Sequence, residues 1–182
     1  MKNPYKTLKS KVVYQTKWIK IIENKIIIDG KNSIFSFLTP KCPKSISVIA
    51  RDSKGNFYLV RQWRYTQDKA TLEFVAGGVE KNETPLHAAK RELFEELGLF
   101  SKKWTFLGRK IDSPGLLKND AYVYLAENIK IKEENFNNIE EYTEKVKMTE
   151  KKLLELIKKN KILDNWTIGA FMKYLLYKNK IK

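Results

Sequence analysis

With 182 residues, one cysteine (Cys42) and no signal-peptide or membrane-spanning apolar run, the chain suits one domain plus a small arm in a reducing compartment, for which we expect the cytoplasm. Its net charge of +15 comes from lysines scattered along the whole chain, which favours general attraction of anionic substrates. Clustered basic residues with interleaved aromatics are lacking, so nucleic acid is not the expected partner.

The first 42 residues are expected to form an antiparallel β arm. Short apolar runs recur between residues 12 and 37, and an Asp29-Gly30 turn signal separates the last two of them. Pro40 and Pro43 then mark a break. We therefore expect an arm at residues 1–42 and a main domain at residues 43–182.

The main domain shows the pattern of a mixed sheet flanked by helices. Strands are expected at residues 45–50, 57–62, 71–75, 104–111 and 121–126. Residues 127–144 are polar and indicate a loop, and Thr149 and then Asp164 or Asn165 each precede a helical pattern. This order of elements predicts an α/β fold.

One helix carries most of the charged chemistry. Thr84-Pro85 is a start signal and Gly98 a stop signal, so the helix is expected from about Pro85 to Leu97. One face is apolar (Leu86, Ala89, Leu93, Leu97), and the other carries Arg91, Glu92, Glu95 and Glu96. Like charges at these spacings repel in an isolated helix, whereas a hard dication among them makes the cluster favourable. A solvated acidic face is the alternative, and the surrounding glycines, Glu83 and Arg91 favour the metal site.

The segment GGVEKNETPLHAAKRELFEELGL, at residues 77–99, matches the pattern G-x5-E-x7-R-E-U-x-E-E-x-G-U, where U is aliphatic, at every fixed position. It resembles the Nudix box of enzymes that use divalent metal ions to hydrolyse a nucleoside diphosphate linked to another group. The resemblance implies a Nudix α/β/α sandwich with a mixed sheet.

The flanking segments resemble one branch of that family, the ADP-ribose and ADP-sugar pyrophosphatases. Residues 62–65 (QWRY) and 72–77 (LEFVAG) are similar to its Q-[YF]-R and E-x-P-A-G segments. Pro114 lies 15 residues after Leu99, as in that branch, and residues 160–167 match its tail pattern. Val75 replaces the usual proline, and Asn119 replaces a frequent acidic residue, which weakens the substrate assignment.

The resemblance also implies roles for individual residues. Metal ions would be held by the carbonyl of Ala76 and by Glu92, Glu95 and Glu96, whereas Gly77, Glu83, Arg91 and Gly98 would be structural. Arg64 would pair with a phosphate or with the sugar side. Trp18 would stack on the base, often across a dimer interface; packing within its own arm is the alternative. Glu73 would line the cleft, either as a substrate contact or as a structural acceptor.

The water-activating base is expected on a mobile loop. In this branch it lies within a pattern like E-[FY]-x-E-V, which residues 141–144 (EYTE) match. Glu141 is the first choice and Glu140 the second, with a solvated loop charge as the alternative. Such a carboxylate would reach the site only on closure. His87 and Cys42 are given no catalytic role.

The expected activity is Mg²⁺-dependent hydrolysis of a nucleoside diphosphate sugar, with Mn²⁺ as the other candidate ion. ADP-ribose or another ADP-sugar is the first substrate, followed by GDP-mannose, and then by 5′-RNA or dinucleoside polyphosphates. A non-catalytic nucleotide-sugar sensor is the alternative from another class. The partners would be this small-molecule substrate and a second copy of the chain through the arm. The base, the sugar, the number of metal ions and any swapping of the arm stay open.

Overall fold

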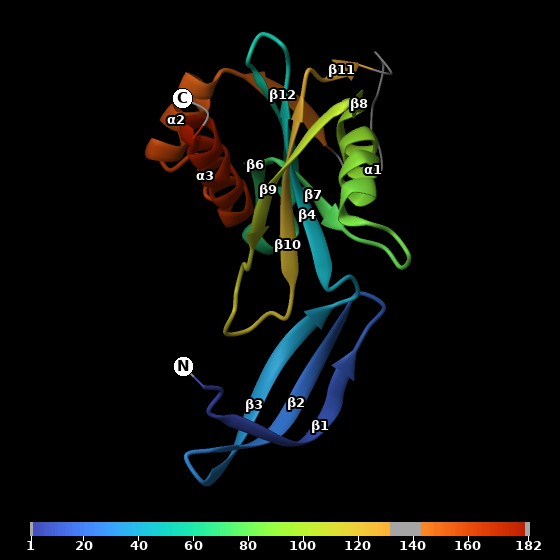
Figure 1. Cartoon of the computed structure of the whole chain (residues 1–182), viewed down its shortest axis with the longest axis vertical. Coiled ribbons are helices and arrows are strands. Elements are labelled where there is room, and N and C mark those ends of the chain that lie inside the picture. The colour runs from blue at the N-terminus through green and yellow to red at the C-terminus, as the bar shows by residue number, and fades with distance from the viewer. Residues whose placement is uncertain (1, 132–142, 181–182) are drawn as a thin grey trace. The chain divides into compact units, whose positions relative to one another are not determined.

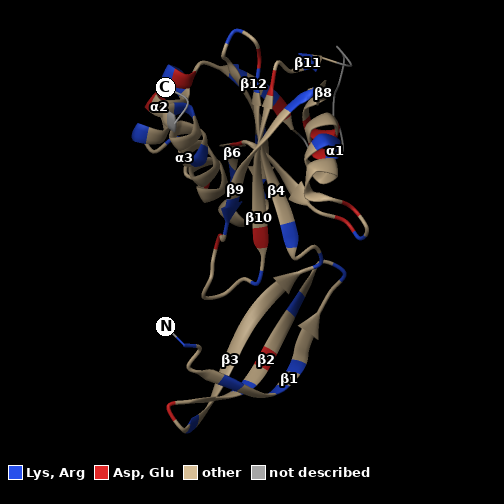
Figure 2. Cartoon of the chain, viewed as in Figure 1, with Lys and Arg blue, Asp and Glu red and all other residues tan. Residues whose placement is uncertain are grey.

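The computed structural model describes residues 2–131 and 143–180, with side chains as far as residue 179. Contacts divide the chain into two compact units. The first unit comprises residues 1–43 and 111–120, and the second comprises residues 44–110 and 121–182. Lysines and arginines occur on strands of both units and on helices of the second unit, in keeping with the scatter seen in the sequence (Figure 2).

The first unit is a three-stranded antiparallel sheet built from β1 (Tyr5–Gln15), β2 (Ile19–Ile28) and β3 (Lys31–Pro40), in that order (Figure 1). Asp29 and Gly30 join β2 to β3 with φ angles of 49° and 74°. Two positive φ values are what a two-residue hairpin turn of the favoured hand requires. The expected β arm is confirmed, with longer strands than the apolar runs indicated.

A loop from much later in the chain pairs with β3. Leu38 donates its N–H to the carbonyl of Leu116 (2.8 Å), and Lys118 donates its N–H to the carbonyl of Leu38 (2.9 Å). Residues 111–120 therefore belong to the compact unit of the arm. The sequence pattern had indicated only a turn at Pro114.

The second unit contains a mixed seven-stranded sheet. Its strands are β4 (Lys44–Arg51), β5 (Phe57–Arg64), β6 (Lys69–Glu73), β7 (Val75–Gly78), β9 (Lys103–Lys110), β10 (Asp120–Glu127) and β12 (Glu144–Met148). The order along the sheet is β12-β5-β4-β10-β9, with β6 paired to β5 and β7 paired to β4. A short 3₁₀ helix (Tyr65–Gln67) follows β5, and β8 (Leu99–Phe100) pairs with β11 (Lys130–Ile131).

Helices cover both faces of this sheet, with α1 (Pro85–Leu97) on one side and α2 (Glu150–Lys158) and α3 (Asn165–Lys180) on the other (Figure 1). Successive strand residues point to opposite faces. Accordingly, Val48 packs in the core under α1, and Ile49 packs in the core that contains Leu153 of α2 and Phe171 of α3. The α/β/α sandwich expected from the sequence is confirmed.

Two expectations for this unit were wrong. The single strand expected at residues 71–75 is interrupted at Phe74, where the chain leaves β5 and joins β4. The segment expected to be a loop up to residue 144 includes β11, and Glu144 begins β12. Val146 and Met148 are the only apolar residues of β12. The strand is therefore determined more by its pairing with β5 than by its composition.

Candidate active site

Helix α1 has the bounds predicted from its caps. The hydroxyl of Thr84 accepts a hydrogen bond from the N–H of His87 (3.2 Å), and Gly98 ends the helix with a φ of 63°. Ala88, Ala89, Leu93 and Leu97 are buried, so Ala88 takes the place expected for Leu86, which is only partly buried. His87 is exposed. The buried face fixes the helix against β4 and β7 and directs Glu92, Glu95 and Glu96 away from that core.

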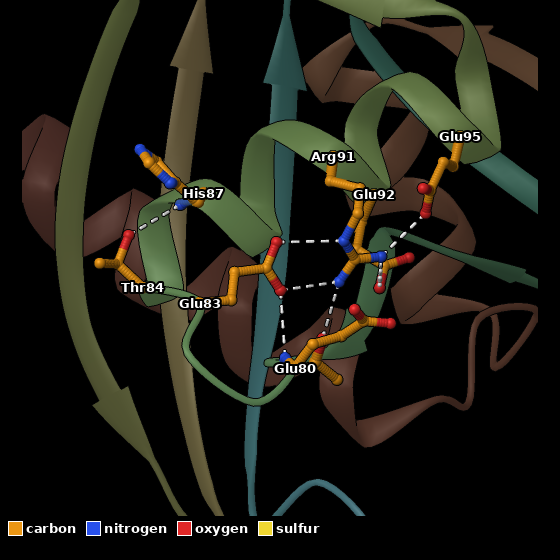
Figure 3. A network of polar contacts seen from close by, with 8 residues as sticks. Glu80, Glu83, Thr84, His87, Arg91, Glu92 and Glu95 are labelled. Atoms are coloured by element: carbon orange, nitrogen blue, oxygen red, sulfur yellow. Dashed lines mark hydrogen bonds and ion pairs between the residues drawn. The ribbon is translucent and has the colours of Figure 1, made fainter.

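Arg91 ties the loop before α1 to the helix (Figure 3). Its guanidinium donates to both carboxylate oxygens of Glu83 (3.1 and 3.0 Å) and to the carbonyl of Gly78 (3.0 Å). It also donates to Glu92 and to Glu95, each at 2.8 Å. These bonds from Arg91 lower the pKa of Glu83, which additionally accepts from the N–H of Glu80. One cation thus offsets the mutual repulsion of three carboxylates.

Glu92 lies directly against the strand that precedes the helix. A side chain at Gly77 would overlap the Glu92 carboxylate, although the backbone of Gly77 is not in the left-handed region. Only a glycine therefore allows this carboxylate to approach the backbone next to Ala76. Glu96 Oε2 is buried, and the charge of Glu96 contributes to raising the pKa of Arg64 on the neighbouring strand.

The carboxylates near Ala76 suit a hard divalent cation only together with other oxygen donors. Within the described ranges, no three His, Cys, Asp or Glu side chains gather in a geometry that would hold a metal by themselves. Arg91 pairs with two of the carboxylates of the helix, Glu92 and Glu95. Two carboxylates, the Ala76 carbonyl and the oxygens of a bound diphosphate are all hard oxygen donors, the kind that Mg²⁺ prefers.

A cavity of about 640 Å³ opens beside this segment. It is lined by Arg64, Thr66, Gln67, Lys69, Thr71, Glu73, Ala76, Gly77, Leu163, Asp164, Asn165 and Trp166. The structure thus brings Arg64, Glu73 and Ala76, three residues with expected roles, to one cavity, with Glu92 behind Gly77. All of these residues belong to the second unit.

Glu73 is a buried acceptor for Arg64. Arg64 donates through Nε to Glu73 Oε1 (2.8 Å) and through Nη2 to Oε2, and Thr71 and Gln62 also donate to this carboxylate. Glu73 is 5% exposed, whereas the Arg64 side chain is 45% exposed. Burial raises the pKa of Glu73, but the bonds from Arg64 and Thr71 outweigh it and hold the pKa below its usual value. Of the two roles expected for Glu73, these contacts favour the structural acceptor.

The Glu73→Gln variant is expected to be less stable than the parent by about 1–3 kcal/mol at neutral pH, because a buried amide has only one acceptor oxygen and turns an NH₂ donor toward the donors of Arg64. A carboxylate with a lowered folded-state pKa stabilises above its unfolded pKa and loses this as pH falls through the folded-state pKa. The difference should therefore be full above the ordinary value of 4.5 and shrink below it. Urea unfolding at several pH values measures it, and a difference independent of pH would contradict the ion pair.

Three other residues with expected roles lie in the first unit or outside the described residues. Trp18 lies in the first unit, 60% exposed, with the ammonium groups of Lys17 and Lys41 at 4.9 and 5.7 Å from its ring centre. Glu140 and Glu141, the candidates for the base, lie outside the described residues.

Sequence reasoning missed one wall of the cavity, formed by Leu163, Asp164, Asn165 and Trp166 at the start of α3. The ammonium of Lys110 lies 3.9 Å from the ring centre of Trp166. The only signal in the sequence is the tail pattern at residues 160–167, which indicates the branch and does not by itself indicate a place in the site.

The family model described as "NUDIX domain" matches residues 42–167, more than half of the chain. The chain belongs to the Nudix hydrolase family. It is 30% identical over 179 residues to an ADP-ribose pyrophosphatase of Bacillus subtilis (strain 168), covering 97% of this chain and 95% of that protein. It is 27% identical over 180 residues to a methanol dehydrogenase activator of Bacillus methanolicus, with the same coverage of 97% and 95%.

The fold of this Nudix hydrolase is similar to that in a crystal structure of an ADP compounds hydrolase, with a TM-score of 0.85 and 15% sequence identity. The match covers 98% of this chain and 96% of the other. Family membership, fold and enzyme class are thus confirmed, and Nudix hydrolases generally use divalent metal ions. Within the described residues, no helix has both the length and the apolar character needed to cross a membrane.

Proposed function

We propose that this Nudix hydrolase cleaves the pyrophosphate bond of ADP-ribose or another ADP-sugar with Mg²⁺, releasing AMP and a sugar phosphate. The observation that carries the proposal is a single cavity lined both by Arg64 and by the Ala76-Gly77 segment on which Glu92 rests. A diphosphate needs a cation with several donors on one side and oxygen ligands for divalent ions on the other.

Each residue of the chain has a distinct task in this proposal. Arg64, oriented by Glu73, binds phosphate oxygens through the donors that Glu73 does not use. Ala76, Glu92 and Glu96 hold the divalent ions, with Glu95 supporting them. When bound, these ions neutralise the diphosphate and activate the attacking water. Glu141, or otherwise Glu140, accepts the proton of that water.

The relatives support the substrate class. The chain covers nearly the full length of a protein named ADP-ribose pyrophosphatase, and its flanking segments resemble that branch. GDP-mannose is the second candidate, and RNA 5′ ends and dinucleoside polyphosphates are further ones. A non-catalytic sensor is disfavoured because every box glutamate is present.

The assembly and compartment complete the proposal. We propose a homodimer formed through the arm, with Trp18 on the base. Support comes from the apolar side chains that the arm leaves exposed: Tyr5, Leu8, Val12, Val13, Tyr14, Trp18, Ile34 and Phe35. The single cysteine supports a reducing compartment, which we take to be the cytoplasm.

The proposed function is tested by phosphate release, coupled to a phosphatase, from a panel of substrates in Mg²⁺ and separately in Mn²⁺. The panel contains ADP-ribose, ADP-glucose, GDP-mannose, UDP-glucose, diadenosine polyphosphates and 5′-triphosphate RNA. We expect the highest kcat/KM with ADP-ribose or ADP-glucose. Turnover only of RNA or dinucleotides would refute the substrate class. Hydrolysis of none of these substrates would favour the non-catalytic sensor.

A further inference from the structure

The strand that carries both halves of the site changes partner at one residue. β6 ends at Glu73, which faces Val60 of β5, and β7 begins at Val75, which faces Val48 of β4. Phe74 lies between them and belongs to neither ladder, with 2% of its surface exposed. A buried backbone N–H at such a point needs a partner from outside the sheet.

Thr167, which follows Phe74 by 93 positions in the sequence, supplies that partner. Its hydroxyl accepts the N–H of Phe74 at 2.9 Å, and Thr167 itself is fully buried. Asp164 in turn fixes the start of α3, because its carboxylate accepts the N–H groups of Trp166 (3.2 Å) and Thr167 (2.8 Å). The ring of Phe74 also packs on Phe171 of α3, with ring centres 6.4 Å apart.

The crossover has a functional residue on either side. Glu73, one residue before Phe74, orients Arg64. Ala76 and Gly77, which follow Phe74 by two and three residues, line the cavity, and Glu92 lies against Gly77. A shift of the Phe74 backbone would therefore move Arg64 and the Ala76 carbonyl relative to each other. We propose that Thr167 is a positioning residue, whose hydroxyl sets the spacing between the phosphate-binding arginine and the metal-binding segment. The inference rests on the proposed function.

The test compares Thr167→Val, which keeps the shape but loses the acceptor, with Thr167→Ser, which keeps the acceptor. Three quantities are measured at least 20 °C below the Tm of each variant: hydrogen exchange in peptides covering residues 70–78, the Kd for Mn²⁺, and kcat/KM. For Thr167→Val we expect exchange about tenfold faster in that segment, Mn²⁺ affinity about tenfold weaker and kcat/KM lower by about 10–100-fold, the range for lost outer-shell partners. Thr167→Ser should stay within about threefold of the parent.

Two results would overturn the proposal. If Thr167→Val only lowers the Tm, while Mn²⁺ affinity and kcat/KM stay within twofold, Thr167 is merely structural. If Thr167→Ser is as impaired as Thr167→Val, the hydroxyl is not the cause. Should the valine variant not fold, Thr167→Cys takes its place, since sulfur is only a weak acceptor. Hydrogen exchange and Mn²⁺ binding are measured without substrate. If the parent protein hydrolysed nothing on the panel, the proposed function would be refuted, and these two measurements would still test the role of Thr167.

Discussion

Replacing Glu96 with glutamine should lower kcat/KM by at least about 100-fold, because loss of outer-shell partners alone commonly costs 10–100-fold and Glu96 is proposed as a direct ligand. Its carboxylate has one oxygen buried, and its charge contributes, after those of Glu73 and Asp164, to raising the pKa of Arg64. The fold should persist, because α1 is held by its caps and its apolar face. Steady-state kinetics on the preferred nucleotide sugar and a thermal melt by circular dichroism measure both effects.

Glu155→Gln is the matched control for this variant. Glu155 is also a helical glutamate, but it lies on α2 and pairs with Lys152 and Lys159 at the surface. Its loss should leave kcat/KM unchanged. If Glu96→Gln keeps more than a tenth of the parent activity with a normal melt, Glu96 is not a ligand, and the metal would have to be held by other groups.

Gly77→Ala should retain the fold and lose activity. The added methyl group would overlap the carboxylate of Glu92, which is the far end of a flexible side chain, so the carboxylate moves rather than the backbone. Displacement of a reacting or ligating group by about 1 Å can cost 100-fold in rate. We therefore expect kcat/KM to fall by about 100-fold and the Kd for Mn²⁺ to rise, with the Tm within about 4 °C of the parent.

The control for Gly77→Ala is Gly115→Ala, since a methyl group at Gly115 would meet nothing within 4 Å. It should match the parent in both activity and Mn²⁺ affinity. A fully active Gly77→Ala protein would mean that the position of Glu92 against the strand is not needed for catalysis, and it would remove one of the supports for the metal site.

The parts of this enzyme that sequence could predict are those specified by neighbours in the chain. Helix α1 was placed correctly because Thr84, Pro85 and Gly98 act within a few residues of themselves. The hairpin at Asp29-Gly30 followed from the same kind of local signal. The α/β class followed from the strand and helix patterns of the main domain, whereas the α/β/α sandwich was implied by the resemblance to the Nudix family.

The parts that escaped prediction depend on contacts between distant segments. The break at Phe74 is specified by two different partner strands and by Thr167, none of which is visible from residues 71–75. The bonds from Arg64 to both oxygens of Glu73 depend on the pairing of β5 with β6, which the sequence pattern does not specify. The pairing of residues 111–120 with β3 has the same origin, because Leu38 on the strand edge bonds to residues 78 and 80 positions later in the chain.

The bond between Phe74 and Thr167 also sets an order of events during synthesis. The two residues are 93 positions apart, so at roughly 5–20 residues per second the ribosome makes the second about 5–20 s after the first. The partners of Arg91 all lie between residues 78 and 95 and are present early. A nascent chain can therefore carry a complete box yet no working cavity, and hydrolysis begins only when α3 has emerged and docked.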